Sequence, residues 1–309
     1  MVKLVTPKAL QAGAMLAVVS PAGSPNPEKV AAGVAALQAL GYRTRLMPHA
    51  LDRGPLNYAG TLADRLGDLH AAFADREVDG ILCTRGGWGS AELLPYLDRA
   101  LIAANPKVFC GYSDITSLHL WLLNETGLKT FYGPMVAADF SKVEGVDLIS
   151  WRSALHGECP LSFDHASGLR TLRAGTAEGR LHGGCLSIYA ESAGTPYAPR
   201  EHGGVLFLED IATRAYQWDR MLLHLRHAGW LEGVTGIVFG DMTQCGDSAG
   251  IEAAILHALR DFSGPIAVGL RSGHVDAGNL TLPLGVPVRL DLGAEGNPLM
   301  HFVEPAVEV

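Results

Sequence analysis

Short apolar runs alternate with amphipathic segments along the first half of the chain. In the amphipathic segments apolar residues recur every three or four positions, which is typical of one buried helix face. Asn26 before Pro27 marks a helix start, and Gly41 marks its end. Strands that alternate with helices form a parallel sheet with right-handed crossovers, so we expect an α/β domain of Rossmann-like type. The expected strands are 16–19, 42–47 and 78–83, and the expected helices are 27–40 and 61–74.

The second half has a different texture, with short apolar runs separated by glycine-rich turns. This pattern predicts a mixed α+β domain with a partly closed sheet. Segment 156–174 has few apolar runs, so we expect an N-terminal domain over 1–155, a linker over 156–174 and a C-terminal domain over 175–309. The expected strands are 179–181, 204–208, 234–239, 266–269 and 286–290, and the expected helices are 186–192, 217–228 and 251–261.

Composition narrows the classes of function. A length of 309 residues suits two domains, and a net charge of −8 with no basic cluster argues against nucleic acid or an anionic membrane as a partner. The five cysteines are odd in number and contain no C-x-x-C pair, which argues against a disulfide framework or a zinc site. We find no signal peptide and no apolar run of membrane-spanning length, so we expect a cytoplasmic protein.

The segment 107–116 carries the first candidate for chemistry. An apolar stretch passes through Gly111 into Ser113 and Asp114, and apolar residues at helical spacing follow, which predicts a strand, a tight turn and a helix. A serine at such a junction is either a helix N-cap or a nucleophile beside free backbone N–H groups. The carboxyl ends of parallel strands meet at one edge, so we expect loops 20–24, 85–90 and 111–114 to converge.

No cofactor is expected. The turn after the first strand has neither G-x-G-x-x-G nor a Walker lysine, which argues against a bound nucleotide. A histidine pair at 224 and 227 lies on a leucine-rich helical segment, where a surface or capping role is more common than metal binding. We therefore expect no metal.

A serine nucleophile needs a base and an acid that orients the base. His274 lies in the turn-rich loop 271–279, where it is either a base or a solvated residue. Glu209 ends an apolar strand, where an acid is either a helix cap or a positioned functional carboxylate. Asp210 can cap the following turn, which leaves Glu209 the better candidate for pairing with a histidine. His119 and His182 are weaker candidates for the base.

Several motifs together resemble the LD-carboxypeptidases, a family whose relatives include the microcin C self-immunity peptidase. The resemblance extends over nearly the whole chain. Its motifs are Ala17-Val-Val-Ser-Pro21, Arg85-Gly-Gly-Trp-Gly89, Gly111-Tyr-Ser-Asp-Ile-Thr116, Tyr132-Gly-Pro134, Phe207-Leu-Glu-Asp210, Asp219-Arg-Met-Leu222, Gly273-His274 and Asn279-Leu-Thr-Leu-Pro-Leu-Gly285.

The resemblance implies a catalytic triad divided between two domains, with Ser113 as nucleophile, His274 as base and Glu209 as acid. We expect the oxyanion to be held by the backbone N–H groups of Asp114 and Gly87, and the Asp114 carboxylate to cap the helix. The family also implies a homodimer.

Recognition of a terminal carboxylate is assigned to two further residues. Arg85 either clamps the substrate carboxylate or bonds loop carbonyls, and Trp88 is expected to wall the pocket.

Three departures from the family pattern bear on the substrate. Cys185 replaces the usual asparagine, Trp88 replaces the usual tyrosine, and segment 195–202 is shorter than the adenine-stacking loop of the immunity peptidases. The leading hypothesis is therefore a serine carboxypeptidase that releases terminal D-alanine from murein tetrapeptides in cell-wall recycling. The alternatives are a microcin C–type peptidase that cleaves aminoacyl or peptidyl sulfamoyl-adenylates, and a non-catalytic ligand-binding relative.

Overall fold

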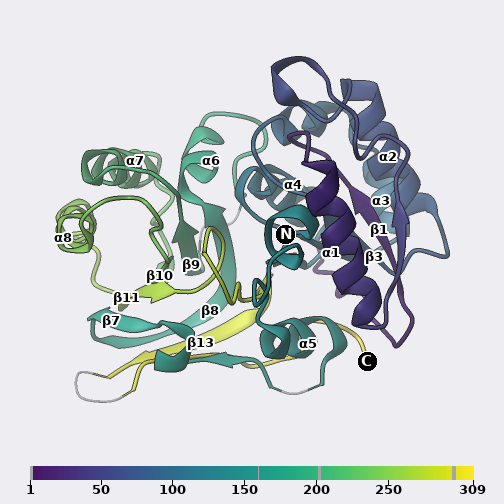
Figure 1. Cartoon of the computed structure of the whole chain (residues 1–309). Coiled ribbons are helices and arrows are strands. Elements are labelled where there is room, and N and C mark those ends of the chain that lie inside the picture. Colours follow the sequence, from purple (N-terminus) through teal and green to yellow (C-terminus); the bar gives the residue numbers. More distant parts are fainter. Residues whose placement is uncertain (1–2, 159, 201–202, 294–296) are drawn as a thin grey trace.

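The fold is built on two sheets. The computed structural model describes residues 3–158, 160–200, 203–293 and 297–309, so Cys159 and the end of the 195–202 loop lie outside the described residues. Figure 1 shows the first sheet with α1–α4 on one side of the molecule and the second sheet with α6–α8 on the other. Along the described chain, no helix is both long and apolar enough to cross a membrane.

The first sheet has the order β12-β5-β4-β3-β1-β2. Its first five strands in sequence pair in parallel, whereas β12 joins β5 antiparallel. The parallel α/β arrangement expected from the sequence is confirmed. The strands are β1 Met15–Val19, β2 Arg43–Leu46, β3 Gly80–Cys83, β4 Val108–Gly111, β5 Thr130–Tyr132 and β12 Leu282–Leu284.

Helices cover this sheet, and the capping residue that the sequence indicates at Asn26 is joined by a second cap at Thr61. Asn26 accepts a hydrogen bond from the Lys29 N–H, and Thr61 forms a reciprocal capping box with Asp64. The capped helices start at residues 27 and 62, within a residue of the expected positions. The helices are α1 Pro27–Ala39, α2 Leu62–Ala74, α3 Arg99–Ala104, α4 Thr116–Thr126 and α5 Leu148–His156.

The second sheet is mixed, with the order β6-β14-β13-β8-β9-β10-β11-β7. Its described strands form one row, so the partial closure that we expected does not extend to a barrel. The strands are β6 Ser162–Phe163, β7 Arg170–Arg173, β8 Gly175–Cys185, β9 Gly204–Glu209, β10 Val234–Gly240, β11 Ile266–Leu270, β13 Pro287–Leu292 and β14 Leu299–Phe302. The helices are α6 Leu186–Glu191, α7 Ala215–His227 and α8 Ser248–Ala258.

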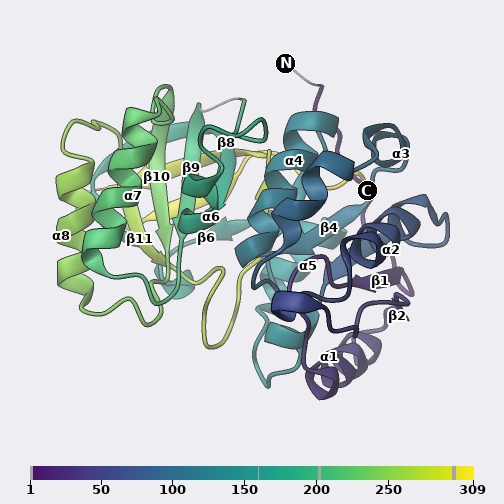
Figure 2. The ribbon, with the colours of Figure 1, turned by 90° about the horizontal axis from the view of Figure 1, so that it is seen from above.

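The expected linker contains structure. Both β6 and β7 lie within 156–174, and they occupy the two ends of the second sheet. In the opposite direction, β12 comes from the C-terminal half and completes the first sheet. The halves lie side by side (Figure 2), and one buried apolar cluster includes Phe131 of β5, Phe207 of β9 and Leu290 of β13. The boundaries that we expect at 1–155, 156–174 and 175–309 remain a prediction.

Candidate active site

Ser113 lies at the sharp turn between β4 and α4. Its φ is 65°, in the left-handed region that a non-glycine residue seldom adopts. Residues 113–115 form a single 3-10 turn, and the cap residue of α4 is Ile115, which makes no side-chain cap hydrogen bond. Ser113 therefore does not cap α4, and its hydroxyl points to another part of the molecule.

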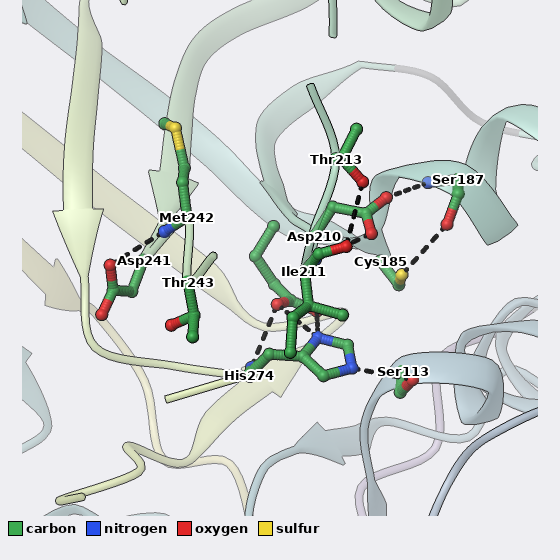
Figure 3. Close-up of polar contacts among 12 residues, drawn as sticks. Ser113, Cys185, Ser187, Asp210, Ile211, Thr213, Asp241, Met242, Thr243 and His274 are labelled. Carbon is green, nitrogen blue, oxygen red and sulfur yellow. Dashed lines mark hydrogen bonds and ion pairs between the residues drawn. The ribbon is translucent and has the colours of Figure 1, made fainter. Parts of the chain in front are cut away.

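The Ser113 hydroxyl contacts His274, which belongs to the C-terminal half of the chain. Ser113 Oγ lies 3.0 Å from His274 Nε2 (Figure 3), and His274 Nδ1 lies 2.8 Å from Oε2 of Glu209. The His274 backbone N–H also donates to Glu209 Oε2, over 3.0 Å. Because a carboxylate only accepts, the proton sits on Nδ1 and Nε2 faces the serine as an acceptor.

The charge state of His274 follows from its surroundings. Burial lowers the pKa of His274, but the charge and hydrogen bond of Glu209 outweigh burial, so the pKa is raised above 6.5. The charges of Asp210 and Asp139 act in the same direction. Glu209 itself is 0% exposed, so its carboxylate depends on these internal hydrogen bonds.

Tyr132 at the end of β5 also contacts this group, and its role was missed from the sequence. Its hydroxyl donates to Glu209 Oε1 and accepts the Ser113 backbone N–H at 3.2 Å. Burial raises the pKa of Tyr132 well above 10, so the hydroxyl keeps its proton. The available signal was the Tyr132-Gly-Pro134 motif at a strand end.

A second network holds the His274 loop. Asn279 accepts from the Gly273 N–H at 3.0 Å and donates to the Gly273 carbonyl at 3.1 Å and to Asp139 Oδ1 at 3.2 Å. Burial raises the pKa of Asp139 to about 6. The ring of Tyr112 stands edge-on to the His274 ring, with centroids 5.1 Å apart. These contacts fix both the position and the plane of the imidazole.

The two aspartates beside the triad residues have structural contacts. The Asp210 carboxylate accepts the N–H groups of Ser187 and Ile211, each at 2.8 Å, so it caps the start of α6 (Figure 3). The carboxylate of Asp114 accepts the Ser90 N–H at 2.9 Å. The expectation that Asp114 caps α4 is therefore wrong, because the carboxylate ties the 85–90 loop to the serine turn instead.

The three loops expected at this edge do converge. Gly23 N–H donates to the Gly86 carbonyl at 3.2 Å, and a β-carbon on Gly86 would lie 2.7 Å from Ser113 Cβ and 3.2 Å from the Asp114 nitrogen. Gly86 thus makes the close approach to the nucleophile. Gly87, the expected oxyanion donor, has φ 107° and lies one residue further along the turn.

A cavity of about 270 Å³ opens beside these loops. Arg85, Gly87 and Trp88 line it, together with Arg53, which the sequence did not single out. Among the described residues, neither arginine has a carboxylate within ion-pair distance, although Arg85 Nη1 lies 3.4 Å from the Ser24 carbonyl. Both interpretations of Arg85 thus keep support: the cavity suits a carboxylate, and the carbonyl contact suits a loop brace.

The remaining candidates do not reach the serine. His119 is buried between the Gly111 carbonyl and Thr130 Oγ1, and burial lowers the pKa of His119 to about 4. His182 Nδ1 faces the Tyr189 hydroxyl at 3.1 Å. The pair at 224 and 227 lies in the last turn of α7.

Cys185, the departure from the family pattern, is buried directly beside Glu209 in the sheet. Its backbone N–H donates to Thr116 Oγ1 at 3.0 Å.

Elsewhere in the described chain, His49, Asp52 and Asp64 bring ligand atoms within 4.8 Å of one another. The Asp64 carboxylate already serves the α2 capping box, so this group does not indicate a metal.

The fold and the geometry together define a class. A strand-to-helix turn presents a partly buried serine hydroxyl to an imidazole whose other nitrogen is held by a buried carboxylate, which is the arrangement of serine hydrolases. Two family models match the chain, the LD-carboxypeptidase N-terminal domain over residues 16–133 and the LD-carboxypeptidase C-terminal domain over residues 178–290. The chain belongs to the LD-carboxypeptidase family, which supports a serine carboxypeptidase.

Individual relatives agree with this assignment. A probable murein peptide carboxypeptidase of Bacillus subtilis is 35% identical, over 92% of this chain and 91% of its own. The crystal structure of an MccF-like protein from Bacillus anthracis has a TM-score of 0.90 at 27% identity, covering 97% of this chain and 100% of its own. A muramoyltetrapeptide carboxypeptidase from Oxalobacter formigenes has a TM-score of 0.84 at 27% identity, over 94% and 99%.

Proposed function

We propose that the protein is an LD-carboxypeptidase that releases the terminal D-alanine of murein tetrapeptides during cell-wall recycling. The observation that carries the proposal is the hydrogen-bonded series Ser113–His274–Glu209, with contacts of 3.0 and 2.8 Å between residues from the two halves of the chain. A relative named as a murein peptide carboxypeptidase and a structural neighbour named as a muramoyltetrapeptide carboxypeptidase support this substrate class.

The chemistry follows from the positions of the protons. His274 Nε2 takes the Ser113 proton as Oγ attacks the carbonyl of the residue before D-alanine. The imidazolium, stabilised by Glu209, then gives that proton to the departing D-alanine nitrogen, and an ester on Ser113 remains. A water deprotonated by His274 hydrolyses the ester and restores the serine.

The tetrahedral oxyanion needs hydrogen-bond donors that stay fixed. The backbone N–H groups of Asp114 and Gly87 are our assignment, and the close approach of Gly86 to Ser113 supports a substrate oxygen held between the two loops. Each such donor contributes about 3 kcal/mol to transition-state stabilisation.

Recognition of the substrate's free end is assigned to the cavity beside the loops. Arg85 would hold the terminal carboxylate through a guanidinium fork, with Trp88 as the wall and Arg53 as a second cation. A cytoplasmic location and a homodimer complete the proposal, and sedimentation of the purified protein would test the dimer.

A microcin C–type peptidase is the second candidate, favoured by the MccF-like neighbour at TM-score 0.90. The short 195–202 segment favours the muropeptide, because less chain is available there to stack on a nucleobase. A ligand-binding relative without activity is the third.

The deciding experiment incubates purified protein with L-Ala-D-Glu-diaminopimelate-D-Ala, and separately with an aspartyl sulfamoyl-adenylate. We expect D-alanine from the tetrapeptide, and a loss of at least about 1,000-fold in Ser113→Ala. Cleavage of the adenylate alone would select the second candidate. Tetrapeptide binding in calorimetry without turnover of either compound would select the third.

A further inference from the structure

The Tyr132 hydroxyl lies between Glu209 and the Ser113 turn, two groups whose relative positions must stay fixed for the reaction. It donates to Oε1 of Glu209 and accepts the backbone N–H of Ser113 at 3.2 Å. Tyr132 ends β5 in the first sheet, whereas Glu209 ends β9 in the second. A single oxygen atom therefore connects the backbone of the serine to the carboxylate that orients the histidine.

We propose that Tyr132 is a positioning residue of the hydrolytic site, which holds Glu209 and the Ser113 turn in register across the two sheets. This inference rests on the proposed function, since it assigns a role in the same reaction. Tyr132 touches neither the substrate nor the reacting atoms, and it acts through Glu209 and the Ser113 backbone.

The hydroxyl is well suited to both contacts. Tyr132 is 0% exposed, so no bulk water competes for the hydrogen bond that its hydroxyl donates to Glu209. Its lone pairs then remain for the Ser113 N–H, at a residue whose φ of 65° is costly to maintain. The buried Glu209 carboxylate accepts one hydrogen bond from Tyr132 and two from His274, so losing the first leaves more negative charge facing the imidazole.

A packing role can be separated from this polar role. The Tyr132 ring contacts Phe207 at a centroid distance of 5.5 Å and Tyr112 at 6.2 Å, and phenylalanine keeps both contacts. Tyr132→Phe removes the hydroxyl alone. Tyr189→Phe is the matched control, because Tyr189 is 1% exposed and its hydroxyl contacts His182, outside the triad.

The experiment measures kcat, KM, the pH profile of kcat/KM and the melting temperature. In Tyr132→Phe we expect kcat to fall about 10- to 100-fold with KM within about twofold, because a hydrogen bond to a charged group is lost. We also expect the acidic limb of the profile to move to higher pH, because Glu209 then holds the proton on His274 more firmly. Tyr189→Phe keeps the wild-type kcat and profile.

A second substitution keeps the proposal testable if the Tyr132→Phe variant does not fold. Placing 3-fluorotyrosine at position 132 makes the donor more acidic, which strengthens its bond to Glu209 and shifts the acidic limb to lower pH. Opposite shifts for the two substitutions would establish the role. A profile unmoved by both, with only a lowered melting temperature, would overturn it.

The His274 ring titration, followed by NMR, needs no turnover. If the wild type hydrolyses no tetrapeptide, the proposed function fails, but the NMR titration still tests Tyr132. An unchanged His274 titration in both Tyr132 variants would overturn the inference whatever the activity.

Discussion

Ser113 has an unfavourable backbone conformation that directs its hydroxyl toward His274. A positive φ at a serine is disfavoured by roughly 1–3 kcal/mol, and the turn persists because its neighbours determine it. Gly86 has no side chain, which leaves room for Ser113 Cβ at 2.7 Å from the place of a β-carbon, and the Tyr132 hydroxyl binds the Ser113 N–H. The result is a hydroxyl directed at His274 instead of at the first turn of α4.

The pH dependence of the reaction follows from His274. The base works in its neutral form, and Glu209 raises the pKa of His274 above 6.5, so kcat/KM should rise with pH through a midpoint above 6.5. Glu209→Gln removes the charge that raises this pKa and leaves the burial that lowers it. We expect the acidic limb to move to lower pH and the plateau to fall at least about 100-fold. An acidic limb that stays in place would contradict this account.

Substitution of the arginines that line the cavity should change the KM for the tetrapeptide. Arg85→Gln and Arg53→Gln should each raise KM for the tetrapeptide, Arg85 by about 10-fold or more, with a smaller change in kcat. Arg43→Gln is the control, because Arg43 is exposed and bonds the Gly13 carbonyl on another edge of the sheet. If Arg85 only braces its loop through Ser24, its variant will instead show a lower melting temperature at an unchanged KM.

The loop that carries His274 is held at both ends by ordered structure. It leaves β11 at Leu270 and enters β12 at Leu282, and Asn279 pairs with both backbone groups of Gly273 inside it. The bond from Asn279 to Asp139 ties this loop to the N-terminal half. A loop braced in this way can place an imidazole accurately without being a helix or a strand.

Asn279→Ala tests this brace. It leaves the buried Gly273 N–H unpaired, and the Gly273 carbonyl keeps only the Val275 N–H. We therefore expect a loss of about 1–3 kcal/mol in the free energy of unfolding and about a 10-fold lower kcat. Asn124→Ala is the comparison, because Asn124 also bonds two backbone groups, at Ala198 and Arg200, but away from the site. Equal kcat values for the two variants would show that the Asn279 bonds serve stability alone.

The two halves share strands and core, and this has a consequence for unfolding. Since β12 completes the first sheet and one apolar cluster runs through both sheets, neither half has a complete fold without the other. The site lies where the halves meet, so its geometry depends on their joint stability.

Calorimetry should therefore show one cooperative transition. Leu282→Ala, in fully buried β12, should lower the free energy of unfolding by about 2–5 kcal/mol and shift that transition as a whole. Leu299→Ala, at a position 43% exposed on β14, should change it by less than about 0.5 kcal/mol. Two resolved transitions, with only one displaced, would contradict a shared core.

The sequence determined the local elements and the composition of the site. The cap at Asn26 sets the start of α1, because such a signal acts within one turn of chain. Parallel strands imply a shared edge, so the convergence of the three loops also followed. The motif resemblance supplied Glu209 and His274, since no pattern at either position distinguishes a catalytic residue from a cap or a solvated side chain.

Only the tertiary structure decided what joins these parts. The bond from Tyr132 to Glu209 spans 77 positions, and that from Asn279 to Asp139 spans 140, so neither appears within any window of the sequence. The return of β12 to the first sheet and the contact of Asp114 with Ser90 are likewise settled by packing between distant segments. Local propensity places each residue on its element, but the close packing of the two sheets chooses its partner.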